Sequence, residues 1–329
     1  MDRILCNRYG DFLFRQGESR ELASGEVRLR VEAAIALPQD IYPPVKGVVP
    51  GRWFCARVEE TAYDVTRVFE DDCVTLLPTF DSEEGIQILG VTMDGCFQQE
   101  MIVREEILSI LPIETEPLIG ACFAPLAILC DALLDEEPAY GRRIGIAGCD
   151  FYGCLAIQAA KALGYSPVCA LDASEAWRRR AVKHGAAFTI NLSNEHAAAR
   201  LRNLTEGGLE KILDTGENPG SEEQTLTCLA DGGKAILLDL GGRKMDLSED
   251  ALAASRKRNT SWTVDRPFDR VIRPAAVRAA HWLIANQKIH MDELVDRTIP
   301  LSALPGAWED AKAGLVRGIL AIEPNMNWE

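Results

Sequence analysis

The chain has 329 residues, of which 47% are hydrophobic and 26% charged, an ordinary composition for a globular protein with room for two domains. Its net charge of −15 argues against a nucleic-acid partner and against binding to an anionic membrane, because both need a basic face. We expect neither a leader peptide nor a membrane span, since no apolar run approaches about 18 residues. The 10 cysteines are scattered without a C-x-x-C pair, which favours reduced, buried thiols in a cytoplasmic protein.

The first part of the chain, to about residue 115, is predicted to be rich in β-strands. Alternating or short apolar runs bounded by glycine and proline indicate strands. These runs lie at 26–31, 54–58, 73–77 and 98–103.

From Ala121 onward, strand patterns alternate with helix patterns. A helix over 123–134 comes first. Strands are predicted at 143–147, 167–172, 188–191, 211–214 and 235–240, with helices from 153, over 174–184, near 195–205 and near 222–229. This alternation predicts an α/β fold with a parallel sheet covered by helices on both faces. A helix over 275–286 and a last strand over 318–322 follow.

Residues 143–153, with the sequence RIGIAGCDFYG, have the layout of a dinucleotide-binding turn. A short strand ends at Gly148, and a helix pattern begins at Gly153 after Phe151 and Tyr152. Asp172 follows 24 residues after Gly148, at the end of the next strand. A carboxylate there accepts hydrogen bonds from ribose hydroxyls and repels a 2′-phosphate, so NAD(H) is favoured over NADP(H).

Asp150 departs from the G-x-G-x-x-G fingerprint, because it replaces the glycine that lets the backbone approach the pyrophosphate. A carboxylate about 4 Å from a phosphate charge costs about 1 kcal/mol in water and about 4 kcal/mol at an effective dielectric near 20. Two arrangements are open. Asp150 rotates away and the dinucleotide binds more weakly, or Asp150 caps the helix and occupies the anion site itself.

Several motifs in order resemble the medium-chain dehydrogenase/reductase superfamily, within its alcohol, polyol and threonine dehydrogenase branch. Residues 94–103 resemble the family's D-G-x-F-A-E-Y-x-V segment, and 123–127 resemble its A-E-P-L-A helix start. Residues 172–186, 214–216 and 231–234 resemble three further family segments. The resemblance implies a GroES-like β-barrel domain, 1–118 and 266–329, around a Rossmann domain, 119–265. It also implies a homodimer or homotetramer, and a small-molecule substrate meeting the nicotinamide in the cleft between the domains.

The same resemblance implies that both zinc sites of the branch are missing. The family's three catalytic ligand positions fall on Leu37, Arg52 and Ala124, none of which binds zinc usefully. The first histidine in the sequence is His184. A structural zinc of the family needs four cysteines between residues 78 and 103, and Cys96 is the only cysteine in that stretch of the sequence.

The leading hypothesis is therefore a zinc-independent oxidoreductase that moves hydride between NAD(H) and a small alcohol, carbonyl or activated alkene. Arg52 is the candidate that stabilises an oxyanion or enolate, unless it forms a structural ion pair with Asp40. Its expected neighbours are Gln39, Asp40, Tyr42, a possible proton donor, and Trp53. The expected cofactor-binding residues are Gly148, Asp150, Phe151, Tyr152, Gly153, Asp172, Thr215 and Leu240.

Two alternatives remain open. Loss of the zinc ligands together with the central glycine also fits a pseudoenzyme, a dehydrogenase fold kept as a binding subunit. A lyase or isomerase that uses Arg52 and Asp40 without redox chemistry is the third hypothesis, and no sequence feature favours it.

Overall fold

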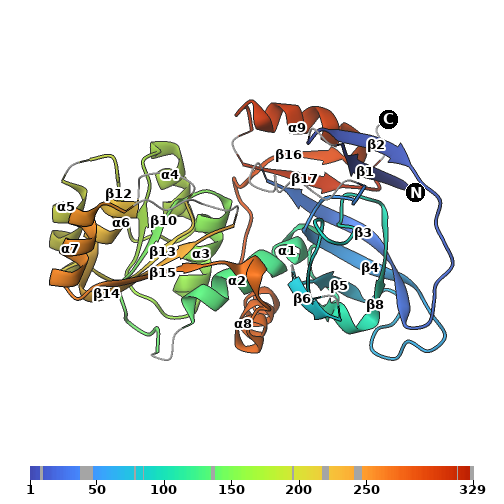
Figure 1. Cartoon of the computed structure of the whole chain (residues 1–329), viewed down its shortest axis with the longest axis horizontal. Coiled ribbons are helices and arrows are strands. Elements are labelled where there is room, and N and C mark those ends of the chain that lie inside the picture. The colour runs from blue at the N-terminus through green and yellow to red at the C-terminus, as the bar shows by residue number, and fades with distance from the viewer. Residues whose placement is uncertain are drawn as a thin grey trace.

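The computed structural model describes residues 1–7, 10–37, 47–77, 79–83, 85–134, 138–194, 196–216, 222–240, 247–316 and 318–326. Figure 1 shows two lobes, one built around a helix-covered sheet and the other from strands contributed by both ends of the chain. The predicted fold class, a Rossmann domain with a GroES-like β-barrel domain, is confirmed.

The first lobe is a parallel sheet with strand order β12-β11-β10-β13-β14-β15. Counted from β10, this is the 3-2-1-4-5-6 order of a dinucleotide-binding fold, in which ligands bind where the order reverses, between β10 and β13. The strands are β10 (Ile144–Ala147), β11 (Val168–Leu171), β12 (Phe188–Ile190), β13 (Leu209–Asp214), β14 (Leu229–Leu238) and β15 (Ser261–Asp265). The helices of this lobe are α3 (Phe151–Ala162), α4 (Glu175–Lys183), α5 (Ala197–Thr205), α6 (Glu222–Thr227) and α7 (Glu249–Lys257).

The pattern missed α7 and β15, and the structure gives the reason. Only Ser255 is buried in α7, so this surface helix lacks the apolar stripe that sequence reasoning looks for. β15 is the last strand in the order of this sheet and leaves Ser261 and Thr263 exposed, so it has no continuous apolar run.

The second lobe is a sheet with strand order β16-β17-β3-β4-β5-β9, in which β8 also pairs with β3. β17 pairs antiparallel with β3, so the end of the chain completes the sheet that its beginning started. The main strands are β3 (Glu26–Ala36), β4 (Trp53–Thr61), β5 (Cys73–Leu76), β8 (Glu100–Arg104), β9 (Leu108–Ile110), β16 (Val295–Pro300) and β17 (Ile319–Glu323). The lobe also holds α9 (Leu304–Lys312) and the hairpins β1 (Asp2–Cys6) with β2 (Phe12–Gln16) and β6 (Thr79–Ser82) with β7 (Gly85–Ile88).

Three helices lie where the lobes meet: α1 (Pro117–Ala121), α2 (Phe123–Leu133) and α8 (Pro274–Ala285). Every residue of α2 is buried, because the helix packs against both α8 and α3. One continuous apolar core runs from α2 into the barrel strands and into the Rossmann sheet. The two lobes therefore share part of their hydrophobic core, which fixes their packing against each other.

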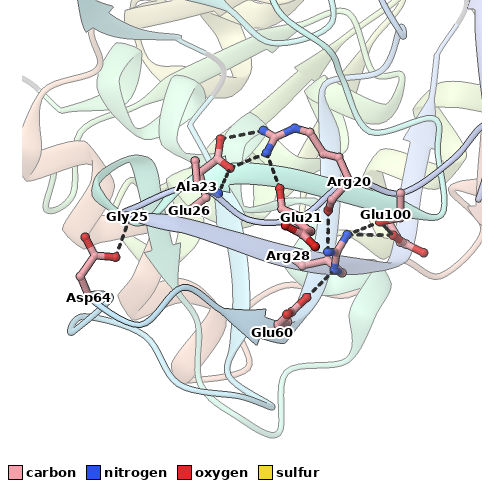
Figure 2. Close-up of polar contacts among 10 residues, drawn as sticks. Arg20, Glu21, Ala23, Gly25, Glu26, Arg28, Glu60, Asp64 and Glu100 are labelled. Atoms are coloured by element: carbon pink, nitrogen blue, oxygen red, sulfur yellow. Dashed lines mark hydrogen bonds and ion pairs between the residues drawn. The ribbon is translucent and has the colours of Figure 1, made fainter.

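The outer face of the barrel carries a network of charged side chains, drawn in Figure 2. Arg20 donates to both carboxylate oxygens of Glu26, at 2.6 and 2.7 Å. Arg28 donates to Glu60 at 2.9 Å and to Glu100 at 3.3 Å, joining β3, β4 and β8. This network pins the segment before β3 onto the sheet.

All 10 cysteines lie within the described ranges and are buried free thiols. Within those ranges, no helix combines the length and apolar character needed to cross a bilayer.

Candidate functional site

The turn after β10 has the tight backbone that the glycine spacing predicts. Gly148 has a φ of +79°, and a Cβ added there would lie 2.5 Å from Cα of Gly216, at the end of the neighbouring strand β13. A Cβ at Gly153 would lie only 1.9 Å from the carbonyl oxygen of Gly148. Both positions therefore need glycine, one for its conformation and one for the close packing of helix on strand.

Asp150 is the N-cap of α3, which begins at Phe151, two residues earlier than the predicted start at Gly153. Its Oδ1 accepts a hydrogen bond from the amide of Gly153 at 3.3 Å. The predicted start was late because the glycine was taken as the boundary, whereas an aspartate three residues before it is a better N-cap. Of the two arrangements open from the sequence, the structure shows the capping one, with a carboxylate at the positive end of the helix dipole.

Asp172 fastens the end of β11 to the glycine turn. Its Oδ2 accepts from the amide of Cys149 at 2.8 Å, and its Oδ1 accepts from the amide of Ser174 at 2.7 Å. The residue is only 6% exposed. Each carboxylate oxygen has a second lone pair, so the group keeps acceptor capacity while it holds the turn in place.

Thr215 is bonded to the turn. Its amide donates to the carbonyl of Ala147 at 2.8 Å, and its hydroxyl lies 3.2 Å from the carbonyls of both Ala147 and Gly148. Leu240 follows β14 and packs into the shared core. Both side chains are buried, and of the two it is Thr215 that holds the turn by hydrogen bonds.

Phe151 and Tyr152, predicted to face a cofactor, are each only 2% exposed. Their rings meet edge to face, with centroids 5.3 Å apart. Tyr152 also reaches across to Trp53 at the start of β4, with centroids 6.5 Å apart. The first turn of α3 is thus part of an aromatic contact between the two lobes.

On the barrel side, Arg52 and Trp53 are buried against Phe268. The guanidinium carbon of Arg52 lies 4.7 Å from the centre of the Phe268 ring, and the Trp53 ring stacks on the same phenyl group at 6.3 Å. The Trp53 indole Nε1 is buried without a hydrogen-bond partner among the described residues. A cation and an N–H donor therefore lie beside the same phenyl ring in largely apolar, buried surroundings, where electrostatic interactions are strong.

Phe268 was not found from the sequence, because it lies in a short 3₁₀ turn, Pro267–Asp269, without a recognisable motif. Charged side chains hold this turn from both sides. Arg266 donates to Asp239 at 3.1 Å, and Arg270 donates to Asp265 at 2.8 Å and also pairs with the buried Asp131 of α2. The ring beneath Arg52 is therefore held by the segment through which the chain returns to the barrel.

Leu37 and Ala124, two of the three expected metal-ligand positions, belong to the same buried core as Trp53. The third, Arg52, carries a positive charge. An alkyl chain, a methyl group and a guanidinium offer no donor set for zinc. No group of three or more candidate ligand side chains occurs in the part of the chain that the structure describes. Gln39, Asp40 and Tyr42 lie outside the described residues, so the pairing of Arg52 with Asp40 stays a prediction.

Part of the sequence is similar to those of known dehydrogenases. A family model described as "Zinc-binding dehydrogenase" matches residues 153–273. The chain is 28% identical over 218 residues to an L-threonine 3-dehydrogenase of Bacillus velezensis, covering 61% of this chain and 63% of that protein. It is 33% identical over 165 residues to the L-threonine 3-dehydrogenase of Thermococcus kodakarensis, covering 50% and 47%. The matches thus span between about half and two thirds of these relatives.

Two solved structures share the fold over nearly the whole chain. Galactitol-1-phosphate dehydrogenase from Escherichia coli superposes with a TM-score of 0.87 at 19% identity, covering 98% of this chain and 100% of that one. 2R,3R-butanediol dehydrogenase from Bacillus subtilis gives a TM-score of 0.85 at 19% identity, covering 98% and 99%. At this identity the likeness concerns the fold.

Proposed function

Because the chain belongs to the medium-chain dehydrogenase/reductase superfamily, we propose that it is an oxidoreductase that moves hydride between NAD(H) and a small alcohol, carbonyl or activated alkene. We propose further that it does so without catalytic zinc. The observation that carries the proposal is the backbone of the β10–α3 turn, in which Gly148 gives the tight bend and Gly153 the close packing of helix on strand that a dinucleotide-binding turn needs.

The turn fits a dinucleotide, with one penalty. Asp150 opposes the pyrophosphate through its charge, but its hydrogen bond to Gly153 is 3.3 Å long, beyond the usual range for an N–H to O bond. Such a weak cap is displaced more readily than a short one. We therefore infer that Asp150 rotates away when the dinucleotide binds, at a cost of about 1 to 4 kcal/mol in affinity.

Asp172 supports a preference for NAD(H) over NADP(H), because its carboxylate repels a 2′-phosphate. Arg178 offsets part of this repulsion. Its guanidinium donates to the backbone carbonyls of Asp172 and Ala173, at 2.8 and 2.7 Å, and so brings positive charge to the same strand end. The preference is therefore expected to be modest.

Arg52 takes the role that zinc has in other members of the branch. A nicotinamide, when bound, supplies the hydride donor or acceptor. The buried guanidinium stabilises negative charge that develops on the substrate oxygen. The Trp53 indole N–H, which lies beside the same Phe268 ring, is a second donor. Tyr42 is the proposed proton donor.

A titration with NADH and NADPH, together with metal analysis of the same sample, tests the proposal. We expect a micromolar dissociation constant for NADH, weaker binding of NADPH and no stoichiometric zinc. The six tryptophans, Trp53 among them, supply the fluorescence signal. Turnover is then assayed across alcohols, ketones and enones. Absence of both cofactor binding and turnover would overturn the proposal.

The capping position of Asp150 favours a second candidate, a pseudoenzyme that keeps the fold as a binding subunit. In that case the carboxylate occupies the anion site permanently. This candidate predicts that the natural chain fails to bind NADH and that Asp150→Gly binds it. Micromolar binding of NADH by the natural chain contradicts it.

We also propose a homo-oligomer, a dimer or a tetramer. The strand order of the Rossmann sheet ends at β15, and an edge strand offers backbone N–H and C=O groups to a second copy. Light scattering after size-exclusion chromatography tests it, and a monomeric mass across the working concentration range would contradict it.

A further inference from the structure

Two buried thiols face each other on neighbouring strands of the barrel. The sulfur atoms of Cys55 in β4 and Cys73 in β5 are 3.3 Å apart. Arg57 is paired directly with Cys73 in the antiparallel register, so Cys55, two residues before Arg57, lies on the same face of the sheet. The pair is diagonal across the two strands, so to form a bond the sulfur atoms must close from 3.3 Å and the strand backbones must shift locally.

The surroundings make the two thiols unequal. The hydrogen bond from the Cys55 thiol, helped by the positive charge of Arg57, lowers the pKa of Cys73 below its ordinary value. The same pairing, together with burial, raises the pKa of Cys55. A pair in which the pKa of one sulfur is lowered and that of its neighbour is raised is the arrangement in which one cysteine attacks an oxidant and the other resolves the product.

The cysteines in the Rossmann core lack this combination. Burial is the main cause that raises the pKa of Cys130 and that of Cys169 to about 12. A buried thiol with so high a pKa is chemically inert. Cys73, in contrast, is the first residue of its strand and lies beside the Arg57 side chain, which is 21% exposed. Cys73 is itself 1% exposed, so a small oxidant reaches its sulfur only after a local opening of the strand end.

We propose that Cys55 and Cys73 form a reversible intrachain disulfide when the protein meets a hydroperoxide. The Cys73 thiolate attacks one peroxide oxygen, the O–O bond breaks, and Cys73 becomes a sulfenic acid as hydroxide or water leaves. The Cys55 sulfur then attacks the Cys73 sulfur, the S–O bond breaks, and a second water leaves. Two thiols and one hydrogen peroxide thus give one disulfide and two waters, with the two electrons passing from sulfur to oxygen.

The proposed disulfide would change the packing of α1, one of the helices that lie where the lobes meet. A Cβ added at Gly120 in α1 would lie 2.5 Å from the Cys55 sulfur, so this sulfur rests directly against the α1 backbone. Drawing the sulfur toward Cys73 withdraws that support. The structure therefore links the redox state of the pair to the packing of α1, from which the chain continues into α2.

The test exposes the folded full-length chain to hydrogen peroxide at neutral pH. Remaining thiols are then alkylated after denaturation, and the peptides are analysed by mass spectrometry. We expect the Cys55 and Cys73 peptides to become linked about tenfold or more faster than Cys130 loses its thiol, and dithiothreitol to reverse the link. Amide hydrogen exchange of residues 117–121 should rise in the oxidised protein.

Variants then assign the roles. Cys73→Ala should abolish the link, whereas Cys55→Ala should leave a sulfenic acid on Cys73 that dimedone traps. Cys130→Ala, a change at an equally buried cysteine, should form the link as the natural chain does. In the natural chain, loss of the Cys130 and Cys73 thiols at the same rate without a Cys55–Cys73 link would overturn the proposal. This result does not depend on whether the variants fold. A link that leaves exchange in α1 unchanged would overturn the coupling to the helix.

Discussion

The two sides of the proposed site, the Rossmann wall and the barrel wall, are built on different principles. On the Rossmann wall the backbone decides the residue type: Gly148 and Gly153 are held by contacts with neighbouring main-chain atoms that no larger residue allows. On the barrel wall side chains vary: Leu37 and Arg52 stand where metal ligands are expected, and the barrel sheet still forms. The glycines of the turn are tied to the packing of the main chain, whereas the residue at position 52 is not, so the proposed roles of the two walls can be tested separately.

Gly153→Ala should have the largest effect, because it disrupts the main-chain packing of the Rossmann wall directly. The new methyl group would lie 1.9 Å from the Gly148 carbonyl oxygen, so α3 must separate from β10. We expect a loss of about 3 kcal/mol or more in stability, seen as a lower midpoint of thermal unfolding. Cofactor binding should be lost as well.

Gly306→Ala is the matched control, because this glycine lies in a helix, α9, and its added Cβ meets nothing within 4 Å. It should be neutral or stabilising by up to about 1 kcal/mol. Equal unfolding midpoints for the two variants would contradict the tight packing described for the turn.

Arg52→Gln should have the next largest effect, confined to the barrel wall. Removing a buried group that stabilises an oxyanion costs about 100- to 1000-fold in kcat. The dissociation constant for NADH should stay nearly unchanged, since Arg52 packs on Phe268, which belongs to a different segment from the glycine turn. Steady-state kinetics beside a binding titration separates the two quantities. A kcat close to that of the natural chain would show that Arg52 is a structural ion pair.

The difference between the walls also explains which features of the site could be predicted from the sequence. Glycine spacing predicted the β10–α3 turn because main-chain geometry constrains residue type, and Asp172 followed from its position at the next strand end. The start of α3 and the role of Phe268 did not follow. The helix start was placed at Gly153 although Asp150, three residues earlier, is the better N-cap by residue type. Phe268 meets Arg52 across more than 200 residues of chain, a contact no local pattern encodes.

Asp150→Gly should raise the affinity of the glycine turn for NADH. Removing the carboxylate restores the glycine of the fingerprint, and we expect NADH to bind about 10- to 1000-fold more tightly. The loss of the helix cap costs only a few tenths of a kcal/mol when glycine replaces it. Isothermal titration of NADH into both proteins measures the change.

Asp150→Asn separates the charge from the space. It removes the charge and keeps a side chain that caps the helix. An affinity close to that of Asp150→Gly would assign the penalty to electrostatics, and one close to the natural chain would assign it to steric exclusion. Unchanged affinity in both variants would contradict any role of Asp150 in opposing the dinucleotide.

The smallest effect is expected on the outer face of the barrel, where charges meet water. Hydrogen bonds from Arg20 hold the pKa of Glu26 at about 2, below its ordinary value of 4.5. Arg20 is 56% exposed, so screening limits the stabilisation to about 1 kcal/mol or less. Because the pKa is lower in the folded state, this stabilisation is present above pH 4.5 and disappears as the pH falls toward 2. Glu26→Gln should therefore unfold more readily than the natural chain at pH 7, and the gap should close between pH 4.5 and 2.

Denaturant unfolding at several pH values measures this gap, with the exposed Glu18→Gln as a control that changes the same charge. A gap that is independent of pH would contradict the assignment to the Arg20–Glu26 pair. Set beside Arg52, the pair shows how far surroundings decide the value of a charge. An ion pair exposed to water contributes little, whereas the charge of the buried Arg52 beside the Phe268 ring is expected to interact more strongly with a nearby charge, which the Arg52→Gln variant tests.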